Sequence, residues 1–470
     1  MRILLPTGAA TESLVRRAAA EYDADVVVTG GIASFLTPHA LRLFLKKKKY
    51  DCVVVSGMCT ASFEQVERET GIPIYRGPRH AADLALVLPL LGTVTLSRTI
   101  PADDFLAARK AESALGRIEK EEKDAIPDFL IRGVKIGGSS RIKVLAEIMV
   151  AHRCGEIQRL VEDYRACGAD IVDLGFGFDA TPDDVARVFS QLLDIDTPLA
   201  VDTQDPMLIR AALTRADIVL SLQETNIPKI GKEVAEAGLA AVVVPGNSTL
   251  AKNIALAKKA GIRCIIADPL LQPAGSGFTR SLSRFKKTGC PVFFGAGNVV
   301  ELFDADSVGM NALLAGIAAE VGASVIFTSE HSDKTKGSIR EMRRATEMMV
   351  LAKDRPFPKD LGIDLLVLKE KRRRREPPLE YDTAQPAQPM PDEIAYDPKG
   401  NFRIGIEGDQ IVAVVNKKAI RGHRWQDVLH TILLQNDVSL LDHAGYLGRE
   451  LYKAELAIRY GRSFEQDGEF

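Results

Sequence analysis

Short apolar runs alternate with amphipathic stretches along the first part of the chain. The runs that we predict to be strands cover residues 2–5, 25–29, 52–56 and 72–75. Helical patterns separate them, for example over 12–22 and 38–48. Buried strands that alternate with helices are typical of a parallel, doubly wound sheet. The pattern therefore predicts an N-terminal α/β domain over residues 1–125, ending in a charged connecting helix at 101–125.

Glycines and hydroxyl side chains follow three of these predicted strands, as Thr7-Gly8, Thr29-Gly30-Gly31 and Ser56-Gly57. Such turns can cradle an anion, and tight turns without a ligand are the alternative. No G-x-G-x-x-G follows the first strand, so the segment lacks the dinucleotide-binding fingerprint.

From residue 128 the alternation of strand and helix repeats. The predicted strands are 131–136, 170–174, 199–202, 218–221, 241–244, 264–267, 292–294 and 324–327. The predicted helices include 142–152, 156–167, 182–193, 207–214, 229–237, 250–260 and 312–321. Eight parallel strands in this length are typical of a (β/α)8 barrel, here over residues 126–368. An open doubly wound sheet is the alternative.

The pattern of the remaining residues predicts a linker and a small third domain. Residues 369–375 read KEKRRRR, and a stretch rich in proline and acidic residues follows, so 369–395 is expected to be a linker. Residues 396–470 fit a small α+β domain, with a hairpin at 401–405 and 410–415 and helices at 425–436 and 443–460.

Composition narrows the class of protein. The net charge of −2 argues against a nucleic-acid partner. No run of about 18 apolar residues and no signal-peptide pattern occurs, so we expect a cytoplasmic protein without a membrane span. The six cysteines include no Cys-x-x-Cys pair, which favours free thiols and no structural metal.

Three aspartates stand where barrel strands end, at Asp173, Asp202 and Asp268. Because active sites of such barrels lie at the carboxyl ends of the strands, these carboxylates are expected to converge. They would suit a ligand rich in N–H donors, such as the amino and ring N–H edge of a pterin. The alternatives are that each aspartate caps the following helix, or that the group coordinates a divalent metal.

Other polar residues accompany the aspartates at this predicted face. Ser221, Asn226 and Asn298 are candidates for further pterin contacts, and Asn298 is also a candidate catalytic group with Asp202 and Asp268. Arg280, His331 and Lys334 are candidates for binding phosphate. The predicted first strand ends in Gly137–Arg141, which places that segment at the same face.

The order of these motifs resembles dihydropteroate synthases. The segments are GADIVDLGFG at 168–177, PLAVDTQDPMLIRAAL at 198–213, ADIVLSL at 216–222 and IIADPLL at 265–271, and the resemblance covers about 128–350. It implies a pterin-binding barrel that joins a dihydropterin diphosphate to an arylamine and releases diphosphate. Asp202 and Asp268 would bind the pterin edge, with Asp173 supporting the pocket, and Mg²⁺ could accompany the diphosphate.

The chain also departs from that family. The segment after the predicted seventh strand reads GAGNVVEL, with Asn298 and no lysine, and the eighth strand is followed by SEHSDK in place of Arg-x-His. The strand-one asparagine motif is replaced by GGSSRIK at 137–143. GAGN is more similar to pterin-dependent methyltransferases, which use an asparagine near the pterin at this strand end.

A second resemblance concerns the last segment. DPKGNFRI at 397–404 and the sequence of 442–467 resemble one subunit family of tetrahydromethanopterin S-methyltransferase. Together, the resemblances imply a dihydropteroate synthase-like transferase of tetrahydromethanopterin biosynthesis, with pterin and arylamine as small-molecule partners and a possible homodimer. The alternatives are a pterin-dependent methyltransferase or corrinoid-linked methyl carrier, and a non-catalytic pterin-binding protein.

Overall fold

The structure is a computed structural model, and it describes residues 1–46, 49–285, 288–355, 357–371, 379–389 and 395–469. The chain forms two compact units, Met1–Leu379 and Glu380–Phe470. Parts of the predicted linker at 369–395 lie outside the described residues, including most of its basic run. The further division of the first unit at residue 125 stays a prediction. No helix of the described residues has the length and apolar character needed to cross a membrane.

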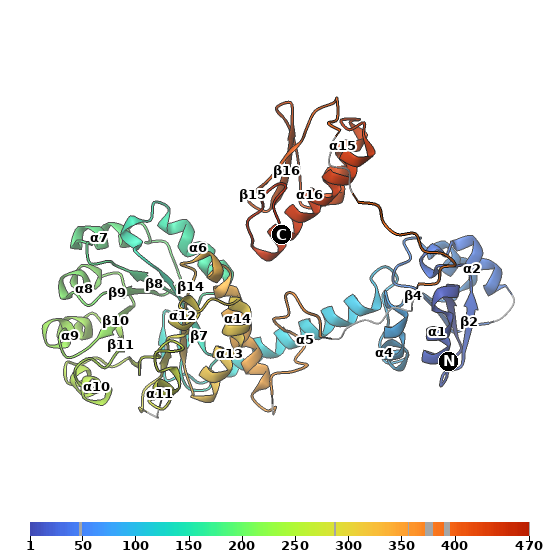
Figure 1. Cartoon of the computed structure of the whole chain (residues 1–470). Coiled ribbons are helices and arrows are strands. Elements are labelled where there is room, and N and C mark those ends of the chain that lie inside the picture. Colours follow the sequence, from blue (N-terminus) through green and yellow to red (C-terminus); the bar gives the residue numbers. More distant parts are fainter. Residues whose placement is uncertain (47–48, 286–287, 356, 372–378, 390–394, 470) are drawn as a thin grey trace. The chain divides into compact units, whose positions relative to one another are not determined.

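The N-terminal sheet is the parallel, doubly wound sheet that the pattern predicts (Figure 1). Its strands are β1 (Ile3–Thr7), β2 (Ala24–Val28), β3 (Cys52–Val55) and β4 (Ile74–Arg76), in the order β2-β1-β3-β4. One face packs on α1 (Glu12–Ala18) and α4 (Leu84–Val87), and the other on α2 (Pro38–Leu45) and α3 (Glu64–Thr70). Short 3-10 turns stand at Ala9–Thr11, Ala33–Phe35, Ala81–Asp83 and Leu88–Leu90.

The prediction of the first barrel strand is wrong. After the connecting helix α5 (Ala102–Asp124), the segment 131–136 forms part of an antiparallel hairpin of β5 (Phe129–Ile131) and β6 (Val134–Ile136). Arg132 and Gly133 form its two-residue turn, with φ of 42° and 82°. Positive φ at both turn positions is the geometry that matches the twist of a hairpin. The Arg-Gly pair was the sequence signal for this turn.

The first barrel strand is instead β7 (Lys143–Ile148), in a segment that the periodicity predicts to be a helix. Two charged residues at its start gave the segment an amphipathic appearance, yet both are buried. Arg141 pairs with Asp170 at 2.6 Å, and Lys143 pairs with Glu122 of α5 at 3.0 Å. Because these partners are distant in sequence, local pattern alone could not reveal that the charges are compensated inside the fold.

The remaining seven strands confirm the predicted (β/α)8 barrel. They are β8 (Ile171–Gly175), β9 (Leu199–Asp202), β10 (Ile218–Leu222), β11 (Ala240–Val243), β12 (Ile265–Ala267), β13 (Phe293–Phe294) and β14 (Val325–Ser329). The sheet runs β12-β11-β10-β9-β8-β7-β14-β13, with all neighbours parallel. A parallel bridge between Ala267 and Val292 joins the two ends of this order and closes the barrel.

Helices surround the barrel (Figure 1). They are α6 (Ile157–Cys167), α7 (Pro182–Ser190), α8 (Pro206–Ala212), α9 (Ile227–Glu236), α10 (Leu250–Lys259), α11 (Phe278–Leu282), α12 (Ala296–Glu301), α13 (Ser307–Glu320) and α14 (Ser338–Ala352). Short 3-10 turns occur at Ala151–Arg153 and Asp333–Thr335. The outward-facing residues of the strands and the apolar faces of the helices form one large core.

The inward-facing residues form a second core inside the barrel. Leu145, Ile171 and Ala200 belong to it, and so do Ile131 and Ile136 of the hairpin. The hairpin precedes the amino end of β7, so it closes the amino end of the barrel. Since successive strand residues alternate between the two faces, the next inward positions toward the carboxyl end are Glu147, Asp173 and Asp202.

The C-terminal unit is the predicted α+β domain with one strand more. An antiparallel sheet contains β15 (Arg403–Glu407), β16 (Gln410–Val415) and β17 (Lys418–Gly422), and two helices follow, α15 (Trp425–Leu434) and α16 (Leu441–Tyr460). The sequence did not predict β17, where a lysine and an arginine are interspersed with smaller residues and most positions are exposed. The predicted apolar stripe of α16 is confirmed, because Leu447, Leu451 and Ala454 are buried against the sheet.

Candidate functional site

Four carboxylates from four strands form a layer at the carboxyl end of the barrel. Glu147, Asp173 and Asp202 lie on the adjacent strands β7, β8 and β9, and Asp268 directly follows β12. Glu147 pairs with Asp173 in the β7–β8 register, and Gly175 pairs with Asp202 in the next. Carboxylate oxygens of Glu147, Asp173 and Asp202 all lie within 4.8 Å of one another. The predicted convergence of Asp173 and Asp202 is therefore present, together with a glutamate that the sequence did not single out.

Asp173 is the most deeply buried carboxylate of this layer. Its side chain is fully buried, and neither carboxylate oxygen forms a well-aligned hydrogen bond with another of the described residues. The backbone N–H of the adjacent Leu174 gives weak support to the charged form. Burial, and then the charges of Asp202 and Glu147, raise the pKa of Asp173 well above its usual value. A buried carboxylate whose hydrogen bonds are so poorly satisfied costs free energy, so this group is expected to hold a proton or to bind a donor or cation.

Asp202 is held from the neighbouring strand by Ser221. The hydroxyl of Ser221 donates to Oδ1 of Asp202 at 2.9 Å. Ser221 lies in an irregularity of the β10–β11 register and has a φ of 62°, which is strained for a residue other than glycine. Burial raises the pKa of Asp202, while the bond from Ser221 lowers it. The strain therefore serves to direct a hydroxyl at a carboxylate in the site.

Asn226 fixes this irregular strand end. Its side-chain nitrogen donates to the carbonyl oxygens of Ser221 (3.2 Å) and Gln204 (3.4 Å), and its side-chain oxygen accepts from the backbone N–H of Gln223 (2.8 Å). The side chain is almost fully buried. Its amide is thus engaged with the backbone, which supports a positioning role instead of the predicted direct pterin contact.

Two carboxyl groups of the layer would titrate near neutral pH. Burial, followed by the charges of Asp202 and Glu301, raises the pKa of Glu147 to about 7. Burial also raises the pKa of Asp268 to about 7, against a backbone N–H of Leu270 that donates to Oδ1 at 2.8 Å. Groups with such pKa values change between acceptor and donor in the physiological range.

The geometry excludes one of the alternatives for Asp173 and Asp202, which is the capping of the following helices. Thr181 and Asp205 are the residues that cap α7 and α8, so Asp173 and Asp202 do not serve as helix caps. Together the layer can accept several N–H donors from one edge of a ligand. Glu147, Asp173 and Asp202 could also hold a divalent cation such as Mg²⁺, since hard cations prefer carboxylate oxygens.

The segment after β14 is organised by Glu301, at the end of α12. Its carboxylate accepts from the hydroxyls of Ser332 and Thr335, both at 2.6 Å, and from the backbone N–H groups of His331 and Ser332, both at 3.2 Å. Burial opposes ionisation, but these bonds hold the pKa of Glu301 below its usual value. An ionised glutamate therefore shapes the loop that carries His331 and Lys334.

The remaining predicted residues are more exposed. His331 is exposed and contacts Glu301 through its backbone, while the Lys334 ammonium bonds to Asp304 (3.0 Å) and to the carbonyl of Phe303 (3.1 Å). Asn298 is exposed on α12, directly after β13, and Arg280 is exposed on α11. These residues belong to segments that follow barrel strands, as predicted, and no hydrogen bond or ion pair among the described residues joins their side chains to the carboxylate layer.

The segment Gly137–Arg141 is misplaced in the sequence prediction. It precedes β7 and so lies at the amino end of the barrel, opposite the carboxylates. Glu147 stands at the carboxyl end of the first strand instead. The spacing offered a signal, because Glu147, Asp173 and Asp202 are separated by similar lengths of chain, each following an apolar run.

Comparison with known proteins identifies the family. The chain is 36% identical to the uncharacterized protein MJ0107 of Methanocaldococcus jannaschii, over 99% of this chain and 98% of that protein. The chain belongs to the family of this archaeal protein. The family model described as PterinBD-DUF4346 matches residues 396–467, which are most of the C-terminal unit. The resemblance of this segment to a methyltransferase subunit stays a prediction.

Solved structures similar to the chain are dihydropteroate synthases. That of Yersinia pestis with a pterine-sulfa conjugate is 20% identical, with 48% of this chain and 97% of that chain covered and a TM-score of 0.39. The enzyme from Thermus thermophilus is also 20% identical, with 44% and 92% covered and a TM-score of 0.36. At this level of similarity the matches assign no ligand to the present chain.

Proposed function

We propose that the barrel binds a dihydropterin diphosphate and joins it to an arylamine with release of diphosphate, as a dihydropteroate synthase-like transferase of tetrahydromethanopterin biosynthesis. The observation that carries this proposal is the layer of Glu147, Asp173, Asp202 and Asp268 at the open end of the barrel. The motif order in the sequence supports it. The description of the family model that matches the C-terminal unit also begins with an abbreviation of pterin-binding domain, although the matched residues 396–467 lie outside the barrel.

The pterin would be held by its edge of N–H donors. Asp202 and Asp268 would accept these bonds, and Asp173 beneath them would support the ring or accept from its amino group. Each carboxylate loses hydration on burial, and a bound N–H edge would supply the well-aligned hydrogen bonds that Asp173 lacks among the described residues. Ser221 would orient Asp202 for this contact.

The transfer itself would depend on positioning and electrostatics. The bond from the pterin methylene to the diphosphate oxygen breaks, the arylamine nitrogen forms the new bond, and that nitrogen loses a proton. The departing diphosphate, whose oxygens would lie on the same side as the arylamine, would be a suitable acceptor for the proton. Arg280, His331 and Lys334 would bind the departing diphosphate, with Asn298 beside the pterin, and Mg²⁺ could accompany the diphosphate.

One observation favours a second function. The strand-seven segment carries Asn298 on α12 and no lysine, as in pterin-dependent methyltransferases. The chain would then bind a methyl-pterin and pass the methyl group to an acceptor such as a corrinoid. A non-catalytic pterin-binding protein is the third possibility. In each case a homodimer and a cytoplasmic location remain expectations from the sequence.

The decisive experiment incubates the full chain with dihydropterin diphosphate and a series of arylamines, including p-aminobenzoate and a ribofuranosyl aminobenzene phosphate, and measures released diphosphate and the coupled product. Product with any amine supports the transferase. No product with any amine rejects it. Methyl transfer from a methyl-pterin, or a cobalamin spectrum of the protein, would then support the second function, and pterin binding alone would support the third.

A further inference from the structure

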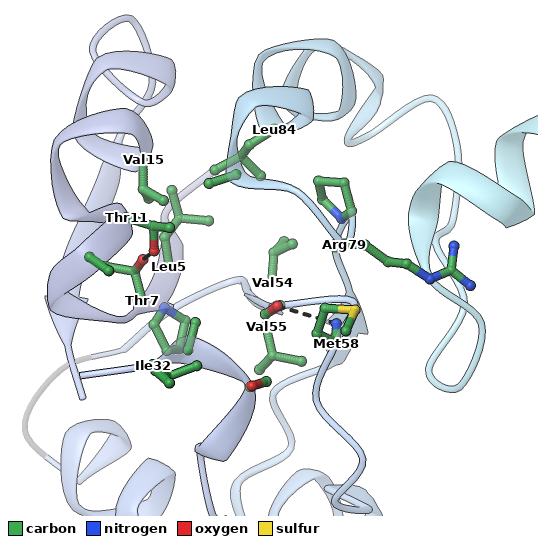
Figure 2. A pocket seen from close by; sticks show the side chains of 18 of the residues that line it. Leu5, Thr7, Thr11, Val15, Ile32, Val54, Val55, Met58, Arg79 and Leu84 are labelled. Carbon is green, nitrogen blue, oxygen red and sulfur yellow. Dashed lines mark hydrogen bonds between the residues drawn. The ribbon is translucent and has the colours of Figure 1, made fainter. Parts of the chain in front are cut away.

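The N-terminal sheet has a cavity at the carboxyl ends of its strands, far in sequence from the carboxylate layer. In the order β2-β1-β3-β4, the chain leaves β1 toward one side of the sheet and leaves β3 toward the other. The loops after these two central strands therefore separate, and ligands of open α/β sheets bind in the crevice formed there. The structure has a cavity of about 180 Å³ at this place, lined by residues of both loops (Figure 2).

Two glycines allow the loops on either side of this cavity to pack closely. A Cβ on Gly8, after β1, would lie 2.6 Å from the carbonyl oxygen of Gly31, after β2. A Cβ on Gly57, after β3, would lie 2.6 Å from the carbonyl oxygen of Gly77, after β4. The strand-end loops thus pack closely in two pairs, each of which requires glycine, and the cavity remains between the pairs.

The cavity is largely apolar. Leu5, Val15, Val54 and Leu84 are buried and form its inner surface. Ile32 and Met58 also line it, although their side chains are 57% and 53% exposed. Exposed apolar side chains at a cavity are available to cover an apolar ligand, whereas at an unused surface they would only cost solvation.

Hydroxyl groups supply the polar part of the lining. Thr7 and Thr11 share a hydrogen bond of 2.9 Å between their hydroxyls, and the hydroxyl of Ser56 accepts from the backbone N–H of Met58 at 3.2 Å. Thr11 also donates to the carbonyl oxygen of Gly8 at 3.4 Å, so the threonine pair uses its own hydrogens, whereas the hydroxyl of Ser56 can still donate its hydrogen. The lining therefore offers hydrogen bonds to a polar substituent on a ligand.

The cavity carries no net positive charge that would attract an anion. Arg79 is the charged residue among the described residues that line it. Its guanidinium pairs with Asp103 at 2.8 Å and also with Asp104, both in the first turn of α5. Figure 2 shows this side chain directed toward α5 and away from Thr7 and Thr11. Two carboxylates thus neutralise the one cation, which argues against the anion cradle considered from the sequence.

Size then selects the class of ligand. An engineered apolar cavity of about 150 Å³ accommodates benzene, so about 180 Å³ accommodates one ring with a small substituent. The cavity is open on one side, so a nucleotide or a second pterin would fill it only in part and would project into solvent. We propose that this cavity is a binding site for an uncharged monocyclic aromatic molecule that carries a hydroxyl or amino group. The proposal is independent of the ligand of the barrel.

The test uses three fluorinated rings with the full-length protein, observed by fluorine NMR. The rings are para-fluorophenol, para-fluoroaniline and the anionic para-fluorobenzoate. We expect saturable binding of the two neutral rings, weaker binding of the benzoate, and no competition by inorganic phosphate. Saturable binding of none of the neutral rings, tighter binding of the benzoate, or displacement by phosphate would each overturn the proposal.

Variants locate the binding. Ala81→Phe fills the cavity from its wall, and Ala85→Phe places the same ring at an exposed position of α4 as the matched control. We expect Ala81→Phe to weaken binding about tenfold or more, since a filled cavity leaves no room for a second ring, and Ala85→Phe to leave it unchanged. Val54→Phe fills the cavity from the sheet and replaces Ala81→Phe if that variant does not fold. Unchanged affinity in a folded filling variant would contradict the assignment.

A barrel variant separates this proposal from the function proposed for the barrel. Asp202→Asn should leave the affinity for para-fluorophenol unchanged, because the residue lies outside the cavity. Loss of this affinity in Asp202→Asn would place the ring in the barrel and refute the N-terminal site. Absence of transferase activity in the unaltered chain, by contrast, would bear only on the barrel.

Discussion

The hydroxyl of Ser221 donates to Oδ1 of Asp202 at 2.9 Å from a residue whose φ is 62°. Alanine at this position would keep the unfavourable backbone and remove the bond, whereas glycine would remove both. We therefore expect Ser221→Gly to be more stable than Ser221→Ala by about 1 kcal/mol, measured by denaturant unfolding. Both variants should bind a dihydropterin more weakly than the unaltered chain. Equal stability of the two variants would show that the backbone at residue 221 is not strained.

The proposed edge contacts predict the effect of neutralising the aspartates. Asp202→Asn and Asp268→Asn should each weaken dihydropterin binding by ~1–3 kcal/mol, the value of a lost charge-assisted hydrogen bond. Calorimetric titration above pH 7 is the measurement, because Asp268 with a pKa of about 7 is ionised only there. Asp183→Asn, at an exposed position of α7, is the matched control. Unchanged affinity in both site variants would refute the contacts.

The raised pKa of Glu147 predicts how stability depends on pH. Its pKa rises from 4.5 to about 7 on folding, so between these values the folded chain binds more protons than the unfolded chain. The contribution of this group to the free energy of unfolding therefore falls as pH rises from about 4 to about 7, and is constant above. Glu147→Gln removes the buried charge, so it should stabilise the protein at pH about 8 by the order of 1–3 kcal/mol and have little effect at pH about 5.

Chemical denaturation at the two pH values measures this difference. Glu156→Gln, an exposed glutamate just before α6, should show no such dependence. If Glu147→Gln is equally stabilising at both pH values, Glu147 does not titrate in this range.

Two glycines next to the site predict contrasting outcomes. A Cβ on Gly175 would lie 2.9 Å from Oε1 of Glu147, the movable end of a side chain. A Cβ on Gly297 would lie 2.8 Å from the buried ring of Phe327. Gly297→Ala should therefore reduce the free energy of unfolding by about 1–3 kcal/mol, while Gly175→Ala changes it by less than about 1 kcal/mol and weakens pterin binding. The reverse order of stabilities would contradict this geometry.

The hydrogen bonds that Glu301 accepts predict that its substitution affects both the stability of the loop after β14 and the binding of an anion by that loop. Glu301→Gln replaces one accepting oxygen by a donor that faces hydroxyl and N–H groups, so it should cost about 1–3 kcal/mol of stability. If the loop binds diphosphate, the variant should also raise the KM for the dihydropterin diphosphate. Glu320→Gln, exposed at the end of α13, is the control. A destabilised variant with an unchanged KM would separate the loop from the substrate.

The sequence predicted most of the fold because most of its strands are locally evident. Seven of the barrel strands coincide with apolar runs that the sequence displays, and Asp173, Asp202 and Asp268 could be located from the ends of those runs. The first strand could not be found in this way. Lys143 and Arg141 are compensated by Glu122 and Asp170, which only the folded chain brings near. Because this strand was not predicted, Glu147 at its carboxyl end was not identified as a candidate either.

The hydrogen-bond partners of polar side chains could likewise not be predicted from the sequence. Asn226 reads as a free amide in a strand-end loop, but the folded chain uses its amide to fix the backbone at Ser221, Gln204 and Gln223. Lys334 reads as a free cation, but Asp304 and the Phe303 carbonyl bind it. Which polar groups remain available to a ligand depends on such distant partners, and a local pattern does not record them.

The β5–β6 hairpin has a consequence for the order of events in the barrel. Because Ile131 and Ile136 close the amino end, every ligand of the carboxylate layer must enter and leave by the same mouth. A second substrate that arrives through this mouth comes to rest above the first, so a reaction between two ligands here would require the deeper one to bind first. The product of such a reaction could leave only after no other ligand occupied the open end of the barrel.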